Sequence, residues 1–271
     1  MHPTVGKRSA VAIATRLAAE GPGAVVIAVG GDGTVHEVGN GLLRGGQGRP
    51  EPAMAVLAAG SGNDFARQMA FPKDPAALLG MLERGGTRRI DAGRLSWPGG
   101  EEWFVNGASF GFTAAANRLT DAPGARHGRI AYTLGGVRAI LSHRDYQVSI
   151  GLDGAEPSLV TIGTGVMANG AWFGAGMHVA PGARVDDGLF SMLTVAGAGR
   201  LRLLGLLAGV FGGWHLRSRT VSLRLVGSVR LEWEGDLPME ADGEPVAVGS
   251  PVEARVHPGA LRVVTGTAGE R

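Results

Sequence analysis

The glycine-rich turn at residues 30–34 (GGDGT) is the feature that most restricts how this chain can fold. An apolar run rich in β-branched residues covers residues 24–29 and predicts a buried parallel strand. Apolar residues at helical spacing follow over residues 35–43 and predict a helix. The turn therefore joins the carboxyl end of a strand to the amino end of a helix, where open α/β sheets bind their ligands.

The chemistry of this turn suits an anionic ligand. Its three glycines let the backbone come close to a bulky anion and expose N–H groups. The amino end of the following helix adds positive potential suited to phosphate. A carboxylate such as Asp32 fits this setting if it holds Mg²⁺ or accepts a proton. The alternative is a tight turn capped by Asp32 and Thr34, since neither the dinucleotide fingerprint nor the Walker pattern is present.

A second turn of the same kind follows about 30 residues later. Residues 53–59 predict another buried strand, which ends in the sequence GSGNDFAR at residues 60–67. Two such units give parallel strands whose turns meet at one edge of the sheet. Asp32 and Asp64 would then lie at adjacent strand ends as candidates for metal binding. The alternative for both is N-capping of the helices that follow.

The rest of the chain divides into two parts. Before Gly93 we expect an α/β domain (residues 1–93), with further helices at residues 5–19 and 74–84 and a strand at 88–95. After it (residues 94–271), short strands separated by turns predict an antiparallel sandwich-like domain. We leave open whether the C-terminal tail returns to the first domain. The later strands are predicted at residues 103–111, 147–152, 158–167, 188–195, 221–225, 229–233 and 252–256, with helices at 130–141 and 201–214.

Composition excludes several classes of function. The chain has no cysteine, so thiol nucleophiles, disulfides and cysteine zinc sites are excluded. A formal net charge of +2 does not indicate a nucleic-acid partner. We expect a cytoplasmic protein, since no secretory signal is visible and the apolar run at residues 201–214 is shorter than the ~20 residues that span a bilayer.

The same apolar run has arginines at both ends, namely Arg200, Arg202, Arg217 and Arg219. Two interpretations are open. The helix can pack its apolar residues into the core and leave the arginines in solvent, or it can dock on a membrane surface. We favour core packing.

Five motifs occur in order along the chain: GGDGT, GSGNDFAR, NGASFGF, APGARVDDGLF and MEADGEPV. Together they resemble the diacylglycerol kinase catalytic-domain family, most closely its bacterial soluble lipid kinase branch. GGDG is shared with NAD kinases, whereas NDFAR is more specific to the lipid kinases. The resemblance implies an α/β nucleotide-binding domain, a β-rich second domain and an active site in the cleft between them. It also implies Mg·ATP as phosphoryl donor and a lipid hydroxyl as acceptor. Because the family usually begins with a strand and an Asn-Pro turn, we expect that first strand to be missing here.

The resemblance also assigns roles to individual residues. The residues expected to contact ATP are Thr4, Gly30, Gly31, Asp32, Gly33, Thr34, Gly60, Ser61, Gly62, Asn63 and Asp64. The family's structural metal loop falls on Asp187, with the backbone carbonyls of Arg184 and Leu189. The two acids of the family's DGE motif fall on Asp242 and Glu244.

Asp242, Glu244 and Asp32 are the expected catalytic residues, but the sequence does not decide whether Asp242 or Glu244 is the base. The alternative for the late pair is an ordinary Asp-Gly hairpin turn. A solvated turn is the alternative for Asp187. Asp91 has no assigned role, and His36 is interpreted as a partly buried helix histidine.

These features predict an ATP-dependent lipid kinase that phosphorylates diacylglycerol or a related lipid. Its partner would be a lipid substrate, met peripherally at the inner face of the membrane. One alternative is an NAD kinase-like enzyme acting on a soluble nucleotide. Another is a nucleotide- or lipid-binding regulator without catalysis. Acceptor-pocket candidates among the aromatic residues, which could equally fill the core, are Phe110, Phe112, Trp172 and Phe173.

Overall fold

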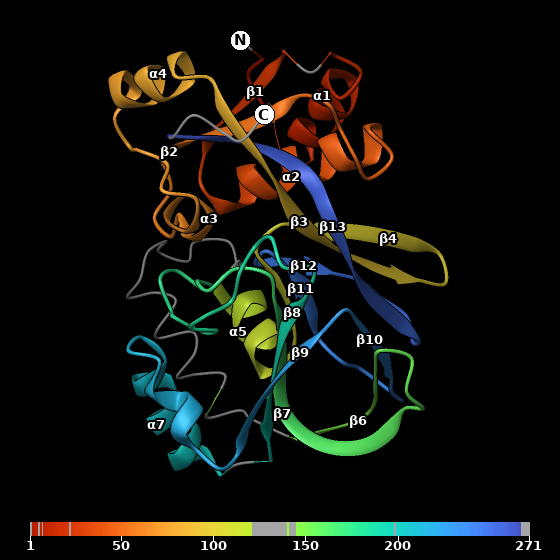
Figure 1. Ribbon diagram of the computed structural model, residues 1–271. Helices are drawn as coiled ribbons and strands as arrows, with labels where there is room; N and C mark the ends of the chain where they lie inside the picture. Colours follow the sequence, from red (N-terminus) through yellow and green to blue (C-terminus); the bar gives the residue numbers. More distant parts are fainter. Residues whose placement is uncertain are drawn as a thin grey trace.

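The computed structural model describes residues 2–4, 6, 8–21, 23–120, 140, 145–197 and 199–266, and all structural statements below concern these residues. Figure 1 shows two lobes, an upper α/β lobe that holds both ends of the chain and a lower, mainly β lobe. Apart from Ile140, the helix predicted at residues 130–141 lies outside the described residues.

The α/β lobe contains the predicted alternation of strands and helices. Its elements are α1 (Ser9–Leu17), β1 (Val25–Gly30), α2 (Asp32–Gly45), β2 (Ala53–Ala58), α3 (Asp64–Gln68), α4 (Pro75–Glu83) and the start of β3 (Gly86–Trp97). Helix α1 is shorter than predicted, because its first turn is fixed from α2: the Glu37 carboxylate accepts the backbone N–H groups of Arg8 and Ala10 at 2.7 and 3.0 Å.

Strand β1 pairs in parallel with β2, as predicted, but the prediction that it is buried is wrong. It lies at the end of the described sheet, and Val25, Ile27 and Val29 on one face are 41%, 42% and 56% exposed. β-branched composition favours a strand, but it does not specify whether that strand is central or at an edge.

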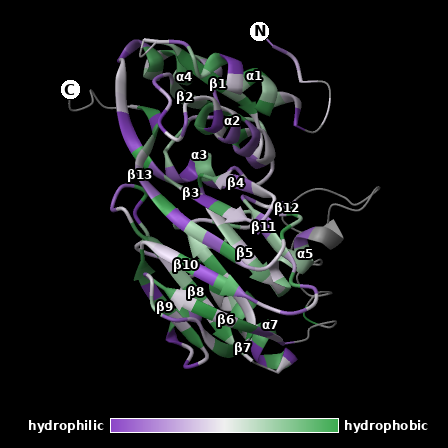
Figure 2. Cartoon of the chain, turned by 90° about the vertical axis from the view of Figure 1, so that its right-hand side faces the viewer, coloured by the Kyte–Doolittle hydropathy of each residue, from purple (hydrophilic) through white to green (hydrophobic). Residues whose placement is uncertain are grey.

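The last strand, β13 (Val252–Thr265), is much longer than the predicted 252–256. It runs antiparallel to β3, pairs with β10 in the lower lobe and bridges to β2 in the upper one through Val263 and Met54. Figure 2 shows this ribbon passing from one lobe to the other. The predicted strand is too short. Pro258-Gly259 is typical of a turn, but in the structure the strand continues past these two residues with a register irregularity between His257 and Leu261.

Asp91, which had no assigned role, holds this irregularity in place. It is 2% exposed, and its carboxylate accepts the N–H of Gly259 at 2.8 Å and the N–H of Gly188 at 2.7 Å. One buried side chain therefore connects β3, β13 and the loop at residues 184–189.

We expect Asp91→Ala to lower the free energy of unfolding by about 3 kcal/mol, because two buried N–H groups lose a charged acceptor. Denaturant unfolding measures this. Asp186→Ala is the matched control, because this neighbouring aspartate makes only solvent-accessible ion pairs with Arg88 and Arg184. Equal effects from the two changes would contradict the role given to Asp91.

The lower lobe is built from antiparallel strands. Its elements are β4 (Gly100–Phe104), β5 (Gly107–Gly111), α5 (Phe112–Thr120), β6 (Tyr146–Leu152), β7 (Ser158–Ala168), β8 (Phe190–Ala196), α7 (Arg200–Val210), the 3₁₀ helix η1 (Trp214–Arg217), β9 (Val221–Val226), β10 (Ser228–Glu232), β11 (Met239–Ala241) and β12 (Glu244–Val246). The main strand order is β1-β2-β13-β10-β6-β7-β5-β11-β12. This order places the β11–β12 hairpin beside β5, and Figure 1 shows the hairpin just below the α/β lobe.

Two predicted elements of this lobe are each divided in two. The strand predicted at 103–111 separates into β4 and β5 at Val105-Asn106, where the backbone turns to meet the β11–β12 hairpin. The helix predicted at 201–214 separates into α7, which ends at Val210, and η1, which begins after Gly213 with its φ of +74°. Among the described helices, none combines the length and the apolar character needed to cross a membrane.

Candidate active site

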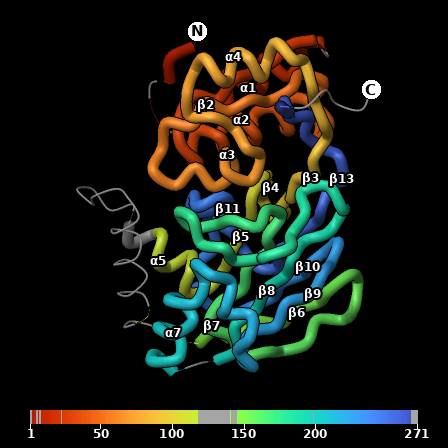
Figure 3. The backbone as a smooth tube through the Cα atoms, turned by 60° about the vertical axis from the view of Figure 1, so that its left-hand side comes forward, coloured from red at the N-terminus to blue at the C-terminus, as the bar shows by residue number. Residues whose placement is uncertain are grey.

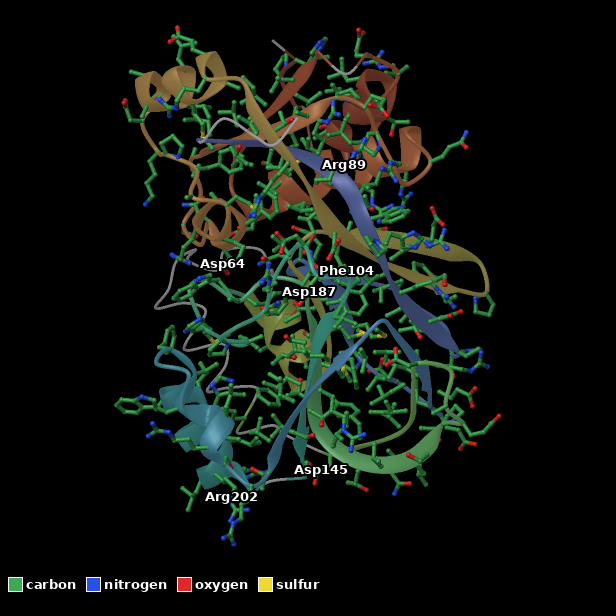
Figure 4. The ribbon with its side chains drawn as sticks, viewed as in Figure 1. Asp64, Arg89, Phe104, Asp145, Asp187 and Arg202 are labelled. Carbon is green, nitrogen blue, oxygen red and sulfur yellow. The ribbon has the colours of Figure 1, made fainter. Side chains whose placement is uncertain are left out.

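A cavity of about 200 Å³ lies between the two lobes. Figure 3 shows α3 directly above β11 and β5, and Figure 4 places Asp64 at this boundary. The lining from the α/β lobe consists of Asp32, Gly33, Val35, Ser61, Gly62, Asp64 and Phe65. The lining from the lower lobe consists of Val105, Asn106, Asn117, Phe173, Gly174, Ala175, Asp242, Gly243 and Glu244. Both glycine-rich turns and the late acidic hairpin therefore face one space.

The two glycine-rich turns touch backbone to backbone. A Cβ atom on Gly60 would lie 2.4 Å from the Cα of Gly31, and one on Gly31 would lie 3.1 Å from the Cα of Gly60. The contact follows from the parallel register of β1 and β2, which ends with Gly30 opposite Ala58. Any side chain at Gly60 would force the two turns apart.

We expect Gly60→Ala to displace one turn by about 1 Å and to cost about 1–3 kcal/mol of stability. The nucleotide that the family resemblance implies should then bind at least tenfold more weakly. Fluorescence titration with a nucleotide analogue and denaturant unfolding measure the two effects. Gly249→Ala is the control, because a Cβ at Gly249 meets no atom within 4 Å. Unchanged nucleotide binding in Gly60→Ala would show that the contact between the turns is dispensable.

Asp32 caps the neighbouring helix rather than its own. Its Oδ2 accepts the N–H of Asn63 at 2.7 Å and its Oδ1 accepts the N–H of Asp64 at 2.8 Å, at the start of α3. Asn63 closes the second turn through hydrogen bonds between its amide and the backbone of Gly60. Burial raises the pKa of Asp32, and the charge of Asp242 adds to the effect.

Asp64 connects the two lobes. Its Oδ1 accepts a hydrogen bond from Arg67 at 2.7 Å, and its Oδ2 accepts the N–H of Ala175, in the loop after β7, at 2.8 Å. Burial, followed by the charge of Asp32, raises the pKa of Asp64 to about 6. A buried carboxylate whose pKa is raised by a second buried carboxylate beside it forms a site that favours a cation.

Asp242 occupies the tight turn of the β11–β12 hairpin, with φ of +51° followed by +91° at Gly243. Its carboxylate accepts three backbone N–H groups at 2.8–3.0 Å, those of Val105, Asn106 and Gly107. Its own N–H donates to the carbonyl of Gly107 at 2.8 Å. Asp242 therefore fixes the hairpin to the bend between β4 and β5.

His36 holds Asp242 from the opposite side, and it is 5% exposed. Its Nδ1 lies 3.1 Å from the Asp242 carboxylate, and its Nε2 lies 3.2 Å from the carboxylate of Glu102 on β4. Burial favours the neutral ring, but hydrogen bonds to Asp242 and Glu102 outweigh it and raise the pKa of His36 to about 9. Arg44, at 2.9 Å, supports Glu102 from α2. A buried row of alternating charges thus connects α2, β4 and the hairpin.

Glu244 lies two residues beyond Asp242 and is partly buried. A Cβ atom added to Gly33 would lie 2.9 Å from its Oε1, so the absence of a side chain at Gly33 makes room for the carboxylate. Glu244 therefore reaches across the cavity to the first glycine-rich turn.

A second, apolar cavity of about 80 Å³ lies beneath α7. Its walls include Phe112 from α5 and Leu203, Leu207 and Val210 from α7. Phe173 lines both this cavity and the one between the lobes, so the two cavities adjoin.

Comparison with known proteins supplies the family. Residues 1–95 match the diacylglycerol kinase catalytic domain, and residues 106–265 match the YegS C-terminal NAD kinase beta sandwich-like domain. The chain belongs to this family of bacterial lipid kinases. The resemblance and the two-part fold class predicted from the sequence are confirmed.

The relatives of this lipid kinase family member cover most of its length. It is 35% identical over 247 residues to the protein named "Probable lipid kinase YegS-like" of Chromohalobacter salexigens, covering 91% of this chain and 77% of the relative. It is 31% identical over 248 residues to a diacylglycerol kinase of Mycobacterium tuberculosis, with 91% and 78% covered. A solved diacylglycerol kinase from Bacillus anthracis shares the fold, with a TM-score of 0.71, 18% identity and 97% and 83% of the two chains covered.

The cavity of this lipid kinase family member brings together eight of the residues singled out in the sequence: Asp32, Gly33, Ser61, Gly62, Asp64, Phe173, Asp242 and Glu244. Other residues of the two turns do not line it, and these are Gly30, Gly31, Thr34, Gly60 and Asn63. Thr4 is exposed in the segment before α1 and does not line the cavity. Phe110 belongs to the core of the lower lobe. Trp172 stacks on His178 with ring centroids 4.2 Å apart.

The predicted metal loop of this protein lies outside the cavity (Asp187 in Figure 4). Asp187 is exposed, and its carboxylate accepts the N–H of Leu189 at 3.1 Å, while Arg184 pairs with Asp186 at 3.3 Å. Within the described ranges, no group of three or more histidine and acidic side chains is arranged to hold a metal ion.

Sequence reasoning missed two buried acids of this site. Glu102 binds His36, and the fully buried Glu240 accepts hydrogen bonds from Ser109 and Asn117. On β4 the side chain of Glu102 is buried, whereas that of the adjacent Glu101 is exposed. In the sequence two adjacent glutamates look like an ordinary solvated pair, so nothing marked Glu102 as buried. Glu240 had a signal, since it lies within the motif MEADGEPV and interrupts an otherwise apolar strand.

Proposed function

We propose that this protein is an ATP- and Mg²⁺-dependent kinase that transfers the γ-phosphoryl group of ATP to the hydroxyl of diacylglycerol or a related lipid. One observation carries the proposal: the carboxylates of Asp32, Asp64 and Glu244 face a single cavity lined by two glycine-rich turns. Phosphoryl transfer requires neutralised phosphates, an aligned acceptor and an orienting base, and this arrangement offers a candidate for each.

Glu244 is the proposed base, and Asp242 is proposed to position it. The Asp242 carboxylate already accepts three N–H groups and contacts His36, which leaves it poorly suited to take a proton. Glu244 instead projects across the cavity toward Gly33. In the proposed step the acceptor O–H gives its proton to Glu244 while its oxygen bonds to the γ-phosphorus. The bond from that phosphorus to the bridging oxygen breaks, and ADP leaves.

The turns at residues 30–34 and 60–64 would bind the phosphates through backbone N–H groups and the Ser61 hydroxyl. Asp32 and Asp64 fit a role in holding Mg²⁺. Both are buried, both have raised pKa values, and every oxygen that accepts one N–H keeps a further lone pair. When bound there, Mg²⁺ would neutralise phosphate charge. Asp187, with the carbonyls of Arg184 and Leu189, remains our proposal for a structural Mg²⁺ in a loop that Asp91 fixes through Gly188.

The apolar cavity favours a lipid acceptor over a soluble nucleotide. Its walls are almost wholly apolar, and Phe173 separates it from the proposed phosphate site. A hydroxyl placed beside Glu244 could extend a hydrocarbon chain past Phe173 into this space. A nucleoside would find few hydrogen-bonding partners there.

Incubation of the purified protein with γ-labelled ATP, Mg²⁺ and a panel of lipids tests the proposal. Label in the organic phase, dependent on diacylglycerol or a related lipid, is the expected result. Label transferred to NAD in the aqueous phase would instead identify the soluble-nucleotide alternative. Binding of ATP without any transfer, by folded protein, would reject catalysis.

A further inference from the structure

The outward side of α7 and η1 is unlike an ordinary protein surface. Leu201 is 86% exposed and Trp214 is 69% exposed. Besides Arg202, the positions between them that also face solvent are Gly205, Ala208 and Gly212. We refer to the five uncharged residues as the α7 face. A surface helix normally carries charged or polar side chains along its outer side, whereas the exposed positions from residue 203 to residue 214 carry none.

The inner side of the same helix is apolar too. Leu203 and Val210 are buried in the core of the lower lobe. No Asp, Glu, Lys or Arg occurs anywhere from residue 203 to residue 216. The single titratable group there is His215, which is buried, donates a hydrogen bond from its Nε2 to the Val179 carbonyl at 2.8 Å and has its pKa lowered by burial. Core packing therefore explains one side of the helix and leaves the other unexplained.

Positive charge frames the α7 face. Arg200 and Arg202 lie at its start and Arg217 and Arg219 beyond its end, and all four are exposed. The sequence contains no acidic residue between Asp187 and Glu232, although that interval contains six arginines. The face and its arginines thus lie in a long segment without any negative charge.

We propose that the α7 face docks on the surface of an anionic lipid bilayer. Leu201 and Trp214 would enter the boundary between headgroups and acyl chains, where amphipathic aromatic and leucine side chains are stabilised. The four arginines would contact lipid phosphates, each contributing to attraction that falls with added salt. A second copy of this chain fits less well, because a two-fold contact would bring the same unpaired arginines together.

The position of α7 agrees with this role. It lies at the end of the molecule away from the α/β lobe, and Arg202 projects outward from its lower end (Figure 4). Leu203, Leu206 and Leu207 of the same helix line the apolar cavity. Docking would therefore place that cavity one helix away from the bilayer surface. Only this last link rests on the proposed function, since binding itself needs no turnover.

Vesicle flotation with the full chain tests the inference. We expect binding to vesicles of phosphatidylcholine with phosphatidylglycerol, weak binding to phosphatidylcholine alone, and loss of binding in high salt. The double change Leu201→Ser with Trp214→Ser should weaken binding at least tenfold. Arg202→Gln with Arg217→Gln should weaken it roughly 30-fold, at about a five- to sixfold loss for each neutralised charge.

Matched controls change the same residue types elsewhere on the surface. Leu79→Ser on α4 and Arg16→Gln on α1 alter exposed side chains of the other lobe and should leave binding unchanged. Equal vesicle binding by the α7-face variants and the wild type overturns the inference. The inference is also overturned if light scattering shows that the α7-face variants lose a dimer while they still float with vesicles.

Kinase assays on a detergent-dispersed short-chain lipid separate this inference from the proposed function. The α7-face variants should keep wild-type turnover there, because none of the changed residues lines either cavity. Lost vesicle binding in a protein that phosphorylates no lipid would support the docking surface and reject only the proposed function. Lost turnover on dispersed lipid in these variants would contradict a role confined to docking.

Discussion

Replacing Glu244 with glutamine is expected to lower kcat for lipid phosphorylation by about 10²–10⁴, the range that a positioned base contributes. Glutamine keeps the size and the hydrogen-bonding reach of the side chain but cannot take the proton. Because Glu244 lies over Gly33 and is not the anchor of the hairpin, the free energy of unfolding should change by less than about 1 kcal/mol. Steady-state kinetics and denaturant unfolding measure both quantities.

The KM for ATP should stay within a few fold, since the proposed phosphate contacts come from the two turns. Glu83→Gln, an exposed glutamate on α4, serves as the isosteric control and should leave kcat unchanged. Asp242→Asn should instead lower the free energy of unfolding. The NH₂ group of the new asparagine cannot accept a hydrogen bond, so one of the backbone N–H groups that Asp242 binds would lose its acceptor. Full activity of Glu244→Gln would remove Glu244 from the mechanism and return the choice to Asp242.

The parts of this site that depend on local sequence could be predicted, and the glycine-rich turns show why. A strand, a run of glycines and a helix are specified by neighbouring residues, and the parallel register then fixes where two such turns meet. The Asp242-Gly243 turn is equally local, since both residues need positive φ. That the hairpin faces the turns was known only through the family resemblance, because β11 pairs with β5, about 130 residues earlier.

What could not be predicted depends on distant partners. The full length of β13 is stabilised by β3 and by the Asp91 carboxylate, neither of which is visible in residues 257–265 themselves. The exposure of β1 depends on which elements pack beside it, and the composition of the strand does not specify those neighbours. Asp32 was open to interpretation as a cap of its own helix, whereas its partners start α3.

The role of His36 also depends on partners that are distant in the sequence. Its replacement is expected to have a large effect on stability. We expect His36→Gln to lower the free energy of unfolding at pH 7 by about 3 kcal/mol, since a neutral amide would leave two buried carboxylates, Asp242 and Glu102, without the cation between them. Equilibrium denaturation of both proteins gives the difference. His2→Gln, at an exposed histidine, is the matched control and should change nothing.

The pH dependence of that difference separates charge from packing. The folded pKa of His36, about 9, lies above the ordinary value of 6.5, so the folded state holds a proton that the unfolded state releases first. Its contribution is fully present below about pH 6.5 and is lost as the pH rises through 9, with Arg8, Arg44 and Asn40 as other polar side chains at the network. The wild type should therefore lose about 3 kcal/mol across this window while His36→Gln stays nearly level. Parallel curves for the two proteins would mean that the ring is neutral and that Asp242 is held by its three backbone N–H groups alone.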